Sequence, residues 1–156
     1  MTEYIHYGSD HFDKNKFIPI KNCYFPSVKP EKHSGMWGSP ISSKNGWKNW
    51  CELNGFDVER LDKSFTFNLK EDSKVLYVRN DNELQDLKLL HCFDRLNLYI
   101  NYGLRDQYCM DFERLLTVHR YDAMEVHVTT NNIYFGLYGW DCDSILILNP
   151  DCVVET

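Results

Sequence analysis

The chain has 156 residues, of which 43% are hydrophobic and 15% aromatic, and its formal net charge is −6. This length is typical of one domain around one core, so we expect a single domain over residues 1–156. The negative charge and the lack of a long basic run disfavour sequence-independent nucleic-acid binding. No apolar run approaches the ~20 residues of a membrane helix, which favours a soluble protein.

The cysteines and histidines do not form a metal-binding pattern. The six cysteines are scattered without a C-x-x-C pair, and no histidine has ligand-like spacing to them. Because thiolate ligands for zinc normally come in close pairs, we expect no metal site. No charged-then-apolar leader precedes the first strand-like residues, which favours free thiols in the cytoplasm.

The N-terminal part of the chain predicts two strands, a long irregular segment and a helix. Residues 3–7 are short and β-prone and run into turn-forming residues. Residues 12–30 contain three prolines and no sustained period, so we expect an irregular, functional loop. Residues 35–40 then predict a brief strand between glycines. Trp47 and Trp50 follow at helical spacing.

The middle of the chain predicts a β-hairpin. Phe65, Phe67 and Leu69 alternate with polar residues, as in a half-buried strand. After a polar turn over residues 70–72, a second β-like run covers residues 75–78. Two such runs separated by a short turn are typical of paired antiparallel strands.

The C-terminal part predicts two helices and two strands. Asn80 or Asp81 can cap a helix that carries leucines on one side as far as residue 90, and residues 112–119 show a second apolar stripe. Residues 123–128 and 144–148 predict strands, the second of them ending at Asn149-Pro150. The whole pattern predicts an α+β fold.

The order of the motifs carries more information than any single residue. H-Y-G-S at 6–9 comes first, G-M-W-G-S-P at 35–40 comes second, and D-S-I-L-I-L-N-P at 143–150 comes on the last predicted strand. This order resembles that of the small NAD-using ADP-ribosyltransferases, over nearly the whole chain. The resemblance implies an ADP-ribosyltransferase-like fold of two small packed β-sheets that form an NAD cleft, with flanking helices.

The resemblance assigns the first motif to NAD binding. His6 matches the family histidine that hydrogen-bonds the adenosine ribose of NAD, and it counts with the catalytic residues. Tyr7 and Gly8 would supply the backbone that holds the nicotinamide amide, and Ser9 would supply a hydroxyl.

The second motif and the helix after it would complete the cofactor-binding wall. Trp37 lies where the family usually has Tyr, and its indole could stack on the nicotinamide ring. Ser39 is the nearby hydroxyl. Trp47 and Trp50 have two open interpretations, as core anchors or, for at least one of them, as part of the cleft lining.

The resemblance places the catalytic acid at Asp143, which matches the family's Glu. That carboxylate would hold the nicotinamide ribose and stabilise the positive charge that develops as the glycosidic bond breaks. Asp is one methylene shorter than Glu, so the backbone would have to lie closer to the ribose. Asp141 and Glu125 are alternative acids, and we otherwise expect both to be solvated edge carboxylates.

The resulting functional hypothesis is a mono-ADP-ribosyltransferase that uses NAD as substrate. ADP-ribose would pass to a macromolecular acceptor, a protein rather than a nucleic acid, and water as acceptor would make the enzyme an NAD glycohydrolase. The alternative from another class is an inactive member of the fold that acts as a protein-binding effector or inhibitor module. The acceptor and the oligomeric state stay open.

Overall fold

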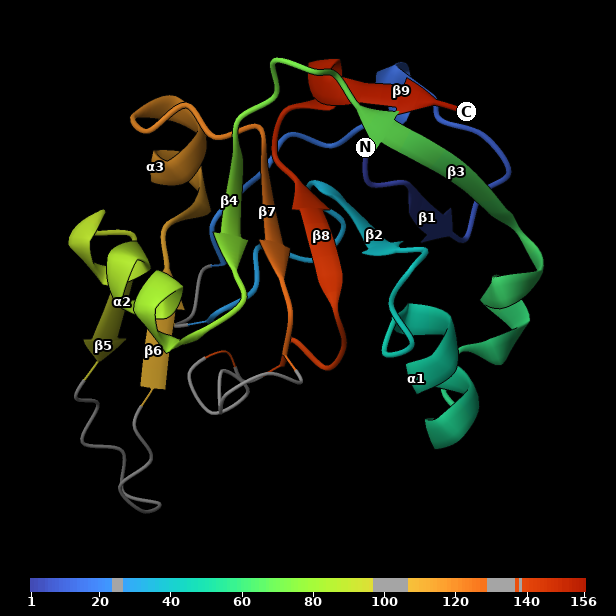
Figure 1. Ribbon diagram of the computed structural model, residues 1–156, viewed down its shortest axis with the longest axis horizontal. Helices are drawn as coiled ribbons and strands as arrows, with labels where there is room; N and C mark the ends of the chain where they lie inside the picture. Colours follow the sequence, from blue (N-terminus) through green and yellow to red (C-terminus); the bar gives the residue numbers. More distant parts are fainter. Residues whose placement is uncertain (24–26, 97–106, 129–136, 138) are drawn as a thin grey trace.

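The computed structural model describes residues 1–23, 27–96, 107–128, 137 and 139–156. Its strands and short helices follow one another along the chain as drawn in Figure 1. The strands are β1 (Tyr4–Tyr7), β2 (Met36–Pro40), β3 (Ser64–Leu69), β4 (Val75–Val78), β5 (Phe93–Leu96), β6 (Gln107–Met110), β7 (Ala123–Val126), β8 (Ser144–Ile147) and β9 (Val153–Glu155). The helices are α1 (Trp47–Asn54), α2 (Asp81–Leu89) and α3 (Phe112–Thr117), with 3-10 turns η1 (Lys14–Lys16), η2 (Val58–Asp62) and η3 (Pro150–Cys152).

The strands form one mixed sheet, so the α+β class is confirmed. Seven strands lie in the order β4-β7-β8-β2-β1-β3-β9, and β5 and β6 form a separate two-stranded ribbon. Among the strand pairs of the large sheet that the described residues form, only β4–β7 is parallel. The expected pair of small packed sheets is wrong for the described residues. Strand β2 is hydrogen-bonded to β1 on one side and to β8 on the other, which joins both halves edge to edge.

The predicted hairpin between β3 and β4 is also wrong. Strand β3 pairs with β1 and β9, which occupies both of its edges, whereas β4 lies at the opposite end of the sheet beside β7. The connection between them passes over the ends of β7 and β8 (Figure 1). Its ends are bonded to other segments, because Lys70 N donates to Cys152 O at 2.8 Å and Lys74 N donates to Asp122 Oδ2 at 2.8 Å.

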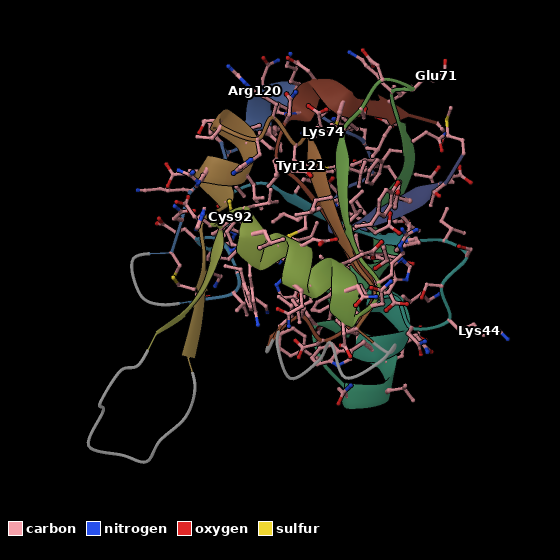
Figure 2. All side chains as sticks on the ribbon, turned by 60° about the vertical axis from the view of Figure 1, so that its left-hand side comes forward. Lys44, Glu71, Lys74, Cys92, Arg120 and Tyr121 are labelled. Atoms are coloured by element: carbon pink, nitrogen blue, oxygen red, sulfur yellow. The ribbon has the colours of Figure 1, made fainter. Side chains whose placement is uncertain are left out.

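Both faces of the sheet are buried, each in its own apolar core. Along β8, Ile145 and Ile147 point into one core and Leu146 points into the other, as the period of two of a strand requires. Helix α2 covers the Leu146 side and lies across β4 and β7 in Figure 2. On the opposite side, Phe65 and Phe67 of β3 fill the core around Ile145.

Helix α2 begins directly after Asn80, one of its two predicted capping residues. The Asn80 side chain accepts a hydrogen bond from Glu83 N at 2.9 Å, which starts α2 as expected. Between residues 12 and 30, η1 is the one regular element among the described residues, so the irregular segment is confirmed there. No described helix has the length and apolar character to cross a membrane.

Candidate functional site

His6 and Trp37 do not share a cleft. The pairing of Ile5 with Ser39 puts His6 opposite Gly38 and turns Trp37 to the other face of the sheet. The packing agrees, because the His6 ring lies 5.1 Å from Phe65 in one core whereas Trp37 packs against the other core. The expected convergence of these two side chains on one NAD site is therefore wrong.

The His6 imidazole has a structural role within the sheet. Its Nδ1 lies 2.6 Å from Trp37 O and donates to that carbonyl, since a carbonyl only accepts. Burial lowers the pKa of His6 below 6.5, because removal from water disfavours the imidazolium. His6 is therefore neutral near pH 7 and links β1 to β2.

The remaining residues of the first motif lie at the turn after β1. Gly8 has φ 106°, and a Cβ there would lie 3.1 Å from the Arg60 guanidinium, so the turn requires glycine. Ser9 Oγ donates to His11 O at 3.1 Å. Tyr7 lies on the face opposite His6, and partial burial together with Glu52 raises its pKa. The described residues thus place Tyr7 and His6 on different faces.

The second-motif residues stabilise the core and the start of α1. Trp37 meets Trp140 edge-on at 4.7 Å between ring centroids. Ser39 Oγ accepts from Trp47 N at 2.9 Å and so caps α1. Ser39 and Trp47 are therefore brought together, but as a helix cap.

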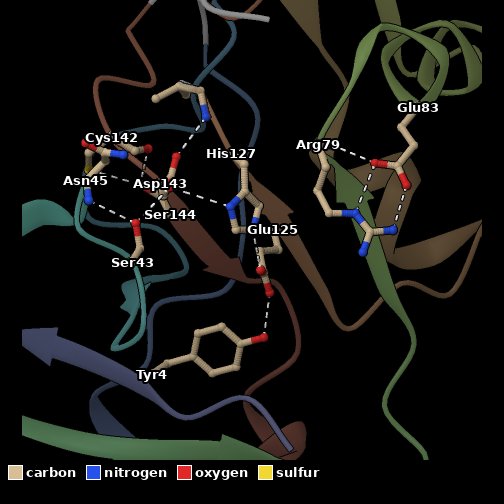
Figure 3. Close-up of polar contacts among 11 residues, drawn as sticks. Tyr4, Ser43, Asn45, Arg79, Glu83, Glu125, His127, Cys142, Asp143 and Ser144 are labelled. Carbon is tan, nitrogen blue, oxygen red and sulfur yellow. Dashed lines mark hydrogen bonds and ion pairs between the residues drawn. The ribbon is translucent and has the colours of Figure 1, made fainter. Parts of the chain in front are cut away.

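Asp143 lies just before β8 and is 4% exposed. Its Oδ1 accepts from Val128 N at 3.0 Å, and its Oδ2 accepts from Ser43 Oγ at 2.8 Å. The same Oδ2 lies 3.5 Å from His127 Nδ1. Figure 3 shows Ser43 and His127, from two segments far apart in the sequence, on this carboxylate.

Glu125 continues this polar network toward β1. Its Oε1 lies 2.7 Å from His127 Nε2, and its Oε2 accepts from Tyr4 OH at 2.6 Å. At 5% exposure Glu125 is buried, so the expectation of a solvated edge carboxylate is wrong. Asp141, in contrast, is 29% exposed in its side chain and lies 4.0 Å from Lys29 Nζ, consistent with a solvated neighbour.

Charge and hydrogen bonding reinforce each other in this network. Hydrogen bonds to Asp143 and then to Glu125 raise the pKa of His127 to about 9, so the ring is an imidazolium at neutral pH. Burial acts to raise the pKa of Asp143, but the hydrogen bonds from His127 and Ser43 outweigh it and lower that pKa. Burial and then Glu125 raise the pKa of Tyr4.

The network is satisfied by its own members. All four carboxylate oxygens of Glu125 and Asp143 accept contacts from protein donors, and both ring nitrogens of His127 face a carboxylate. Such an arrangement is expected to fix β7, β8 and β1 relative to one another. The sequence signal was the i, i+2 spacing of Glu125 and His127, which puts both on one strand face. Among the described residues, no His, Cys, Asp or Glu cluster could hold a metal ion.

A second feature is a partly exposed apolar surface on α1 and on the segment that connects it to η2, which we call the α1 patch; its tryptophans are half-buried and its other members are exposed. Trp47 and Trp50 stack at 5.2 Å, and Phe56 meets them edge-on at 5.9 and 5.6 Å. Leu53 and Val58 complete the patch with 79% and 47% exposure. Neither tryptophan belongs to the two cores, so the core-anchor interpretation is wrong.

The chain was compared with known protein families, curated proteins and solved structures. No protein family, curated protein or solved structure gives a significant match to the chain.

Proposed function

We propose that the chain is a protein-binding module that docks an apolar segment of a partner protein on the α1 patch. The observation that supports this proposal is the concentration of exposed large apolar side chains on one short stretch. Leu53, Phe56 and Val58 are 79%, 50% and 47% exposed within six residues. Exposed apolar side chains that are concentrated in one part of a protein surface often mark interaction sites.

The α1 patch has the anatomy of a docking surface. Gly55 takes φ 59° at the end of α1, which turns the chain so that Phe56 packs back on Trp47 and Trp50. The three rings therefore hold one another in place before a partner arrives, which reduces the entropy lost on binding. Aromatic rings of this type dominate binding energies in protein interfaces.

Charged residues beside the α1 patch form ion pairs with each other. Lys48 lies 3.9 Å from Glu52, and Arg60 lies 3.7 Å from Asp57. An apolar centre with a polar rim is the usual composition of a protein interface, and the paired charges leave the centre without strong net charge. The partner is therefore expected to contribute apolar side chains at the centre.

The polar network supports binding rather than catalysis as the role of the fold. A carboxylate that stabilises a developing cation has to direct an oxygen at the substrate. Both oxygens of Asp143 are already directed at protein donors, and Asp143 is 4% exposed. Freeing an oxygen of Asp143 would break its hydrogen bond with Val128 N or Ser43 Oγ and so weaken the contact between the ends of β7 and β8.

Photo-crosslinking tests the proposal. A photoreactive amino acid at Leu53 in the full chain is expected to give a discrete crosslinked product with one protein, identified by mass spectrometry. The matched control is the same amino acid at Leu89, a leucine on α2 that is 76% exposed. A Trp50→Ala change should abolish the product while circular dichroism stays unchanged. Equal products from both positions, or a crosslink to a second copy of the chain, would overturn the proposal.

NAD-consuming ADP-ribosyl transfer is the second candidate, and one observation favours it. Glu125 is a glutamate, the residue type that the family uses. Like Asp143 it has both carboxylate oxygens bonded to protein groups, so in this candidate Tyr4 or His127 has to release one oxygen before it can face a substrate. Release of nicotinamide from NAD by the purified protein tests this candidate. Glu125→Gln should remove that activity, and Asp141→Asn should keep it. Absence of nicotinamide release with protein acceptors and with water would reject the candidate.

A further inference from the structure

Strand β4 has one edge without a strand neighbour. It lies at an end of the large sheet and pairs with β7 alone among the described strands (Figure 1). Val78 O accepts from His127 N at 3.0 Å, so Val78 directs its backbone groups toward β7. Consecutive residues of a strand direct their N–H and C=O groups to opposite edges, so those of Val75 and Tyr77 point to the free edge. Among the described residues, no other segment forms a hydrogen bond with the backbone of Val75 or Tyr77.

The free edge of β4 is not protected in the usual ways. Proteins shield an exposed strand edge with a proline, a bulge or a charged residue within the strand. The structure describes all of β4, whose sequence is V-L-Y-V and whose register with β7 is continuous, and it has none of these features. Of the two flanking cations, Lys74 Nζ donates to His119 O at 2.7 Å, and Arg79 Nη2 lies 2.7 Å from Glu83 Oε1. Both cations are therefore held by groups of this chain, and the edge stays available for pairing.

An open hollow of about 430 Å³ adjoins this edge. Val75 and Tyr77, the residues with unpaired backbone groups, line the hollow from β4. Thr2 and Tyr4 line it from the N-terminal part of the chain, and Leu69 lines it from β3. A strand that pairs with β4 would lie about 4.8 Å from it and would therefore run along the hollow.

We propose that the free edge of β4 binds an extended apolar segment of another protein, which adds to the sheet as a further strand. The backbone of this segment exchanges hydrogen bonds with Val75 and Tyr77, and every second side chain faces the hollow. Lys70 and Glu71 line the hollow with opposite charges, so it selects no strong charge of either sign. A single extended chain fits between β4 and the other residues that line the hollow, whereas β4 of a second copy would bring its own sheet and α2 with it. This surface shares no residue with the α1 patch and does not rest on the proposed function.

Amide hydrogen exchange of the full chain, followed by NMR, tests the proposal. The probe is a capped peptide of alternating threonine and valine. In the free chain, the amides of Val75 and Tyr77 should exchange faster than those of Leu76 and Val78, which face β7. At a peptide concentration about ten times its Kd, exchange at Val75 and Tyr77 should slow about 10-fold, because only about a tenth of the chains are then free. Exchange at Leu76 and Val78 should stay unchanged.

Two matched controls separate strand addition from general surface binding. Val75→Pro removes an N–H donor from the free edge and keeps the bonds to β7, so it should weaken peptide binding at least about 5-fold. Val75→Thr keeps the donor and should bind the peptide like the wild type. The same peptide with an N-methyl group on every residue keeps the side chains but loses the N–H donors. It should protect neither amide of the wild-type chain, a result that does not depend on how a variant folds.

Three outcomes would overturn the proposal. The first is the absence of saturable protection at Val75 and Tyr77 with the threonine and valine peptide. The second is equal protection by the N-methylated peptide, which would show that backbone pairing is not involved. The third is protection of both amides without peptide that rises with the concentration of the chain, which would assign the edge to a second copy.

Discussion

Asp143→Asn should destabilise the protein strongly at pH 6 and much less at pH 10. The amide keeps the shape of the side chain but removes the negative charge that faces His127 at 3.5 Å. Its NH₂ group must also face one of the present donors, Val128 N or Ser43 Oγ. Removing one partner of a buried ion pair typically costs 3–5 kcal/mol. In the variant, His127 still has Glu125 as an ion-pair partner at 2.7 Å, so we expect a loss of unfolding free energy at the low end of this range, about 3 kcal/mol at pH 6.

The dependence on pH identifies the cause of the loss. His127 has a pKa of about 9, so at pH 10 its ring is mostly neutral in the wild type and the ionic contribution disappears. The cost should then fall to about 1–2 kcal/mol, the value of the lost hydrogen bonds. Urea unfolding followed by tryptophan fluorescence measures both values. A cost below about 0.5 kcal/mol at pH 6, or an equal cost at both pH values, would refute the reasoning. Asp141→Asn, at the partly exposed neighbour, is the control and should change the unfolding free energy by less than about 0.5 kcal/mol.

Three further predictions follow from burial and charge. The pKa of His127 is raised from 6.5 to about 9 in the folded chain, so the stability that the imidazolium contributes is complete below pH 6.5 and is lost as pH rises through 9. Because 27% of the side chain is exposed, we expect the unfolding free energy of the wild type to fall by about 2 kcal/mol over this range. An unfolding free energy that does not fall would contradict the prediction. Gly38→Ala puts a Cβ 3.0 Å from Phe67 Cζ and should cost about 1–3 kcal/mol in urea unfolding, in contrast to a neutral Lys44→Ala. None of the six cysteines is in a disulfide, so the intact mass without reductant should correspond to six thiols, and Cys23 should react with a thiol reagent before the buried Cys51. A mass lower by disulfide hydrogens would overturn this.

Local patterns predicted the elements better than their pairing. The Asn80 cap, the stripe over residues 112–119 and the strand at 144–148 all appear in the structure because each depends on nearby residues. The β3–β4 hairpin was wrong because strand partners are chosen by long-range contacts. The C-terminal strand β9 takes one edge of β3, and nothing within residues 64–78 indicates it.

The candidate site depended on which strand face each residue occupies. His6 and Trp37 lie on adjacent strands, but a register that pairs Ile5 with Ser39 separates their side chains, and register cannot be read from either motif alone. Glu125 was predicted on a strand, yet its burial follows from Tyr4 and His127 contacts across the sheet. Whether the motif resemblance extends to NAD chemistry stays a prediction.

The most direct test of the binding-module account is the affinity of the crosslinked partner for purified wild-type chain and for the Trp50→Ala variant. Titration calorimetry should show at least about 10-fold weaker binding for the variant, since a buried interface aromatic typically contributes more than 1 kcal/mol. Leu89→Ala, on α2, should bind like the wild type. An affinity that Trp50→Ala leaves unchanged would contradict the account.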